Sequence, residues 1–227
     1  MPISPLYRLS VSAVRGAACS LNAACHAVSL PVASASRWLA AGVMGALLAT
    51  TSPAALAVEI KGVTFADQVT TQSGQPLTLI GSGLFTYLLW DAYVGAYYQD
   101  ARRPRPAPLK DVSRRLVLEY FHAIDAEDFA KATTKGVRKN LAAADFAVIE
   151  PELTRFNRAY QDVVPGDRYA LQWLSAGGGS GSGTLSLVLN GQVIFESDSL
   201  ALANGLFAIW LGDEPAQQDF RTQLLGQ

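Results

Sequence analysis

Acidic residues are absent from the first 57 positions of this 227-residue chain, where only three basic residues occur, Arg8, Arg15 and Arg37. The other 170 residues contain all 19 Asp and Glu against 15 Lys and Arg, which gives them a formal charge of −4. They also lack any run of five or more basic residues, the kind of cluster that binds nucleic-acid phosphates. The charge distribution therefore argues against a nucleic-acid-binding protein and divides the chain into a leader and a domain.

Cysteine is absent after residue 57, because Cys19 and Cys25 both lie in the leader. This absence excludes disulfides, thiolate nucleophiles and cysteine-bound zinc from the domain. The domain has one histidine, His122, which is too few for a histidine metal site and follows a predicted strand, as structural or surface histidines do. We therefore expect neither a metal site nor a cofactor.

The leader has the features of a secretory signal peptide. Trp38–Ala49 is an apolar stretch of twelve residues that follows Arg37 and precedes the cleavage motif Ala55-Leu56-Ala57. Twelve helical residues span only about 18 Å, whereas a bilayer core is about 30 Å thick, so no stable membrane span is expected. We expect cleavage after Ala57 and a periplasmic or secreted protein; the alternative is a buried N-terminal helix. The long segment before the apolar stretch indicates either a start codon placed too far upstream or an extended leader.

Residues 58–227 are predicted to form one α+β domain. A chain of this length buries about 70% of its unfolded surface, which is enough for a core without disulfides. Strands are predicted at 58–65, 77–80, 84–98, 114–121, 168–174, 184–189 and 193–195, with Asn190-Gly191 as a hairpin turn. Helices are predicted at 125–141, 151–163, 198–210 and 215–225. The glycine run 177–183 precedes a strand rather than a helix, which favours a hairpin connection over a phosphate-binding loop.

The candidate ligand-binding residues lie in segment 84–98, LFTYLLWDAYVGAYY, whose six aromatic residues predict one long strand. Alternation along that strand places Phe85, Tyr87, Asp91, Tyr93 and Tyr97 on one face. Asp91 stands out because it lies in the most apolar segment of the chain. Such a carboxylate pairs with a basic side chain, lies at a strand edge in water, or lines a cavity.

Several short motifs resemble those of the bacterial, exported branch of the chalcone isomerase-like family. They are VEIKGVTF at 58–65, LIGSGLF at 79–85, AYVGAYY at 92–98, the Asn190-Gly191 turn, LFAIWLGDEP at 206–215 and LLG at 224–226. Each motif is weakly specific alone, but their order and spacing cover nearly all of residues 58–227. The resemblance implies an antiparallel sheet of long strands with helices packed on one face, and a ligand cleft between the two layers.

The resemblance also implies how the plant enzymes of this family work, and where this chain differs. Those enzymes close a chalcone to a flavanone, and an arginine near the start of the long strand stabilises the developing anion. By the resemblance, Phe85 occupies the arginine position and Tyr93 the position of a substrate-binding threonine, and the catalytic tyrosine has no counterpart. Fatty-acid-binding relatives use the same arginine to hold a carboxylate. Phe85 therefore argues against both activities.

Three functional hypotheses remain open. The first is an exported, non-catalytic binder of a small apolar or aromatic ligand, in a cleft lined by Phe85, Tyr87, Tyr93 and Tyr97. The second is an isomerase or intramolecular lyase in which Asp91 acts as base and Tyr93 or Tyr97 as hydrogen-bond donor. The third is a structural or interaction protein whose cleft is filled by its own aromatic residues. Neither the ligand nor the oligomeric state follows from the sequence.

Overall fold

The computed structural model describes residues 57–102, 104–177 and 179–227. The predicted signal peptide, Trp38–Ala49 included, lies outside the described residues. None of the helices in the described part of the chain combines the length and hydropathy needed to cross a bilayer.

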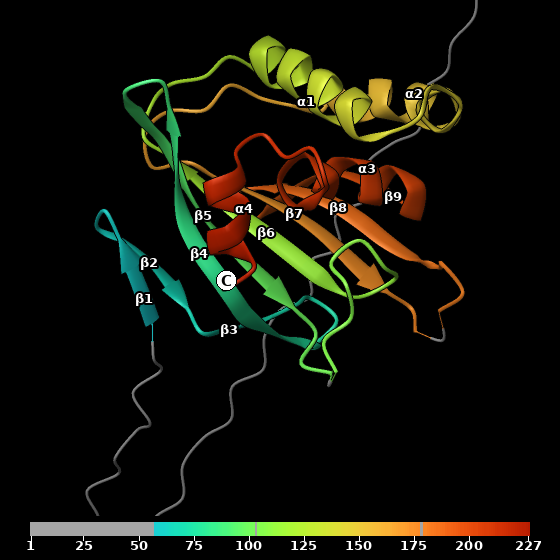
Figure 1. The fold of residues 1–227 in the computed structure, drawn as a ribbon, viewed down its shortest axis with the longest axis horizontal. Coiled ribbons are helices and arrows are strands. Elements are labelled where there is room, and N and C mark those ends of the chain that lie inside the picture. The colour runs from blue at the N-terminus through green and yellow to red at the C-terminus, as the bar shows by residue number, and fades with distance from the viewer. Residues whose placement is uncertain (1–56, 103, 178) are drawn as a thin grey trace, which may run out of the picture. The chain divides into compact units, whose positions relative to one another are not determined.

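A seven-stranded antiparallel sheet forms the centre of the domain (Figure 1). Its strands are β3 (Gln68–Thr70), β4 (Pro76–Tyr87), β5 (Trp90–Gln99), β6 (Arg114–Tyr120), β7 (Arg168–Ser175), β8 (Gly183–Leu189) and β9 (Gln192–Ser197). Neighbours in the sheet are neighbours in the chain, so each strand pairs with the next one through a hairpin or a longer connection. The predicted turn at Asn190-Gly191 is confirmed, with φ values of 49° and 87°, and the glycine run connects β7 to β8 as predicted.

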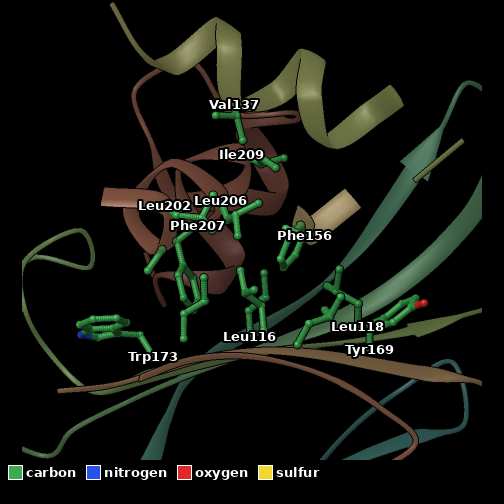
Figure 2. Packing of buried hydrophobic residues seen from close by; sticks show 14 of the residues in the cluster. Leu116, Leu118, Val137, Phe156, Tyr169, Trp173, Leu202, Leu206, Phe207 and Ile209 are labelled. Atoms are coloured by element: carbon green, nitrogen blue, oxygen red, sulfur yellow. The ribbon is translucent and has the colours of Figure 1, made fainter. Parts of the chain in front are cut away.

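Four helices pack on one face of this sheet, which confirms the predicted α+β class. They are α1 (Ala126–Asn140), α2 (Ala143–Asn157), α3 (Leu200–Leu211) and α4 (Gln218–Leu224). Helix α3 is almost entirely apolar because it is covered on both sides. Figure 2 shows Leu206 and Phe207 directed toward Leu116 of the sheet, and Ile209 toward Val137 of α1. The two helices approach closely at Gly136, where a Cβ atom would lie 3.0 Å from Ile209.

A separate hairpin covers part of the other face of the sheet. The predicted strand 58–65 is divided into β1 (Ala57–Ile60) and β2 (Val63–Ala66) by a turn at Lys61-Gly62, where both φ values are positive. Val63 and Phe65 are buried against the sheet, in a second apolar cluster. Strand residues therefore alternate between a helix-facing core and this outer cluster.

The predicted long strand 84–98 is wrong: β4 ends at Tyr87, β5 begins at Trp90, and Leu88-Leu89 forms the turn between them. Two leucines carry no turn signal, since Gly, Asn and Asp are the residues that normally adopt the positive φ found at Leu88.

The second predicted helix also has different limits, because it begins at Ala143 and contains Pro151 in its interior. Its buried residues Phe146, Ile149, Leu153 and Phe156 recur every three or four positions, and their packing outweighs the hydrogen bond that the proline cannot donate. The helix does not extend to Val163, which instead pairs with Ile124 in an isolated β-bridge.

Candidate ligand-binding site

Phe85 and Tyr93 are the two predicted site residues that the structure brings together. They are opposite one another on β4 and β5, and their rings stack with a centroid distance of 4.5 Å and an interplanar angle of 9°. Phe220 of α4 contacts both rings edge-on, at 5.5 Å and 5.6 Å. The Tyr93 hydroxyl accepts a hydrogen bond of 3.0 Å from Nε1 of Trp210, and burial raises the pKa of Tyr93 well above its ordinary value. This pair is part of the packed layer between sheet and helices.

Tyr97 lies on the same face but belongs to a different set of contacts. Its side chain is fully buried, and its hydroxyl donates to Oε1 of Gln99 at 2.8 Å. Gln99 in turn donates from Nε2 to the carbonyl of Pro106, also at 2.8 Å. Burial raises the pKa of Tyr97, so its hydroxyl is a neutral hydrogen-bonding group that connects β5 to the following loop.

Tyr87 and Asp91 lie at the exposed end of the β4–β5 hairpin. Tyr87 is 65% exposed. The Asp91 carboxylate forms an ion pair of 3.0 Å with Nζ of Lys61, in the β1–β2 turn, and is 3.5 Å from the Thr86 hydroxyl. Of the three environments considered for Asp91, pairing with a basic side chain is the one found.

The space between the sheet and the helices is nearly filled. A cavity of about 20 Å³ remains there, which is room for about one water molecule. Aliphatic side chains and aromatic rings fill this space, and the rings contact one another at centroid distances of 5.2 to 6.1 Å. The cavity is lined by leucines and by Tyr120, Phe156, Tyr160, Tyr169 and Trp210. In this conformation the inner cavity admits no ligand larger than water.

A much larger groove lies on the opposite face of the sheet, beside the β1–β2 hairpin. Its volume is about 660 Å³, within the range of sites that hold small organic ligands. Its lining residues are mostly apolar or neutral, and none is acidic: Ala57, Thr64, Phe65, Ala66, Val69, Thr70, Tyr98, Arg115, Val117, Gly166, Arg168, Ala170, Val188, Asn190 and Gly191. We call this site the outer groove.

Arg115 gives the outer groove its positive charge. Its side chain lies on β6 between Tyr98 of β5 and Gln172 of β7, and Nη1 donates to Oε1 of Gln172 at 3.3 Å. Nε is buried without a hydrogen-bond partner, and within the described ranges no carboxylate forms an ion pair with this guanidinium. Burial lowers the pKa of Arg115, and it raises the pKa of Tyr98 to about 12, against the opposing effect of Arg115.

The second arginine of the groove is already paired. Nε of Arg168 contacts the carboxylate of Glu119, and its guanidinium carbon lies 5.6 Å from the centre of the Phe65 ring. The outer groove thus combines apolar walls with one guanidinium, on Arg115, that can bind an additional anion.

Arg115 was not among the residues predicted from the sequence, although one signal was present. Arg114 and Arg115 are adjacent on a strand, so their side chains point to opposite faces of the sheet. Arg114 is fully buried on the helix side, where it donates to Asn204 at 2.6 Å and to the carbonyl of Lys110. Two adjacent arginines at the start of a strand that continues with Leu116, Val117 and Leu118 therefore indicate a specific contact on each face.

Comparison with known sequences identifies the family of this chain. The profile described as chalcone isomerase-like matches residues 57–226, almost the entire described part of the chain. The chain belongs to the chalcone isomerase-like family. Among solved structures, it is similar to the crystal structure of a fatty-acid-binding protein of Arabidopsis thaliana, with a TM-score of 0.57 and 16% identity over 75% of this chain and 96% of that one. No protein of curated function matches the sequence.

The aromatic packing at Phe85 can be compared with the arginine that the resemblance implies for the plant enzymes. By the resemblance noted above, this position holds an arginine in the plant enzymes. In the structure Phe85 has a ring that stacks on Tyr93 and contacts Phe220. Of the two arginines of β6 that form no ion pair within the described residues, Arg115 lines the outer groove, whereas Arg114 is buried on the helix side.

Proposed function

We propose that the protein is an exported, non-catalytic binder of a small apolar ligand, and that this ligand lies in the outer groove with an acidic group against Arg115. The observation that carries the proposal is the guanidinium of Arg115, which has a buried Nε without a partner and no carboxylate bound to it within the described residues. A charged group held in that way is costly unless it gains an anionic partner.

The size and lining of the outer groove support the same proposal. A volume of about 660 Å³ accommodates a medium-chain amphiphile, and side chains such as Phe65, Val69 and Val117 bury its apolar part. The inner cavity, at about 20 Å³, needs a displacement of helices before it can hold the same molecule. The cleft predicted from Phe85, Tyr87, Tyr93 and Tyr97 finds less support, because Tyr87 is exposed at the hairpin end while Phe85 and Tyr93 pack on Phe220.

The isomerase alternative also finds less support. It uses Asp91 as base and Tyr93 or Tyr97 as donor, but Asp91 is paired with Lys61. Both tyrosines are buried, Tyr93 bonded to Trp210 and Tyr97 to Gln99. The third hypothesis, a cleft filled by its own aromatic residues, agrees with the packing on the helix side and is compatible with a ligand on the other face.

The proposal is tested by comparing dodecanoate with dodecanol in isothermal titration calorimetry. The two ligands share an apolar chain, but only dodecanoate has a carboxylate for Arg115. A hydrogen bond to a charged group contributes about 1.5–3 kcal/mol, which corresponds to about a 10- to 150-fold difference in Kd. We expect Arg115→Gln to weaken dodecanoate binding by that factor and to leave dodecanol binding unchanged.

A matched control is Arg105→Gln, which removes the same charge from an exposed loop outside the groove. It should bind dodecanoate like the wild type. Equal dodecanoate affinity in wild type and Arg115→Gln contradicts the proposed site, as does a wild type that binds neither ligand.

A further inference from the structure

The end of the β4–β5 hairpin is the most exposed apolar feature among the described residues. Its four consecutive side chains have exposed fractions of 65% for Tyr87, 79% for Leu88, 96% for Leu89 and 66% for Trp90. The turn lies at the upper left of Figure 1, where the long strands β4 and β5 end. We call these four residues the hairpin tip. Neither the fold nor the outer groove needs them to be apolar.

The sequence of the hairpin tip is unfavourable for the isolated protein in two respects. Four large side chains are left in water, where each loses the free energy that burial provides. Leu88 also has a φ of 54°, in the left-handed region, which costs a residue with a bulky side chain about 1–2 kcal/mol. Asparagine or glycine avoids both costs at a two-residue turn. Leucines at this turn are therefore best explained by an apolar contact made outside the described part of the chain.

We propose that the hairpin tip inserts into the interface of a lipid bilayer. The order of its residues matches the order of depth in a membrane: Leu88 and Leu89 form the end, and Tyr87 and Trp90, paired across the hairpin, lie one residue behind. Leucine is favourable in the hydrocarbon region, whereas tyrosine and tryptophan are enriched at the headgroup level.

The small area of the hairpin tip favours lipid over a protein partner. A stable protein interface involves about 20–30 residues on each side and about 800 Å² per partner, whereas the tip offers four side chains. A bilayer requires no such complementary surface.

The charges beside the tip determine which lipid is needed. Lys61 and Asp91 lie beside the tip and neutralise one another in an ion pair of 3.0 Å. The ring of His122 also lies beside the tip, edge-on to the Trp90 ring at a centroid distance of 6.1 Å. We therefore expect binding to uncharged, zwitterionic lipid, with little dependence on salt.

Cosedimentation with phosphatidylcholine vesicles tests this proposal. The double substitution Leu88→Asn/Leu89→Gly supplies the preferred turn residues, so the hairpin still folds while both leucines are removed. We expect it to lower the partition coefficient at least tenfold. Val148→Gln, which removes an exposed apolar side chain from α2, is the matched control and should bind like the wild type.

The apolar stretch Trp38–Ala49 is a second source of lipid affinity wherever the leader is retained, so every protein compared, the wild-type reference included, carries Leu47→Arg/Leu48→Arg, which breaks that stretch. A second measurement uses phosphatidylcholine with brominated acyl chains in a Trp38→Phe background, where quenching should disappear in Trp90→Phe. Equal vesicle binding by the wild type and the Leu88→Asn/Leu89→Gly variant contradicts the proposal, and so does binding that requires anionic lipid. These outcomes are independent of dodecanoate binding, which Arg115 determines.

Discussion

Substitution of Phe85 by arginine tests whether the helix-side cleft is filled or open. In the structure the Phe85 ring stacks on Tyr93 at 4.5 Å and contacts Phe220 edge-on at 5.5 Å. Removal of a fully buried phenylalanine costs about 3–5 kcal/mol; Phe85 is partly buried, but the guanidinium that replaces it adds a desolvation cost among these rings. We expect Phe85→Arg to lower the free energy of unfolding by about 3–5 kcal/mol, a large part of the 5–15 kcal/mol of a typical domain.

Thermal and urea unfolding measure this loss. For a domain of this size, 3–5 kcal/mol corresponds to a decrease in Tm of about 6–20 °C. Phe85→Leu is the control, since it keeps an apolar side chain and should cost less. Dodecanoate should not restore the stability of Phe85→Arg through the introduced cation. A Phe85→Arg protein that unfolds like the wild type and gains stability from the fatty acid at that cation refutes the filled-cleft description.

Three further predictions follow from the packing and the sequence. Gly81→Ala should cost about 1–3 kcal/mol, because its Cβ atom would lie 2.1 Å from the carbonyl oxygen of Gln223; unchanged urea unfolding contradicts this contact. Purified protein should not accelerate the cyclisation of a chalcone above the buffer rate, since loss of a charge-stabilising donor costs about 10²–10³ in rate; turnover like that of the plant enzymes would overturn the argument from Phe85. Intact mass of exported protein should give Val58 as the first residue, and a product that retains Trp38–Ala49 contradicts cleavage after Ala57.

From β6 to α4 the order of strands and helices was predictable because local patterns determine it, whereas β3 and the limits of β4 and β5 were not predicted. The Asn190-Gly191 turn and the nearly uniform apolar composition of α3 each indicate their structure without information from the rest of the chain. Alternation also placed Phe85, Tyr93 and Tyr97 correctly on one face, the helix side. It failed at Leu88-Leu89, where two apolar residues form a turn that neither composition nor periodicity signals.

The outer groove was not predictable from the sequence. It requires the β1–β2 hairpin to fold back over the sheet, which brings Phe65, Val117 and Val188 to one cavity from three distant segments. The ion pair between Lys61 and Asp91 depends on the same arrangement. Contacts between residues far apart in the sequence are determined by tertiary packing. The adjacent arginines at 114–115 are therefore visible in the sequence, but the residues that surround them are not.

The proposed ligand lies in the outer groove and not between the sheet and the helices. Methyl NMR distinguishes the two sites, because adjacent residues of one strand lie on opposite faces of the sheet. Val117 and Val188 line the outer groove, and Leu116 and Leu187 line the inner cavity. Titration with dodecanoate should shift the methyl signals of Val117 and Val188 and leave those of Leu116 and Leu187 in place. Shifts confined to the two leucines would contradict the outer-groove site and place the ligand on the helix side.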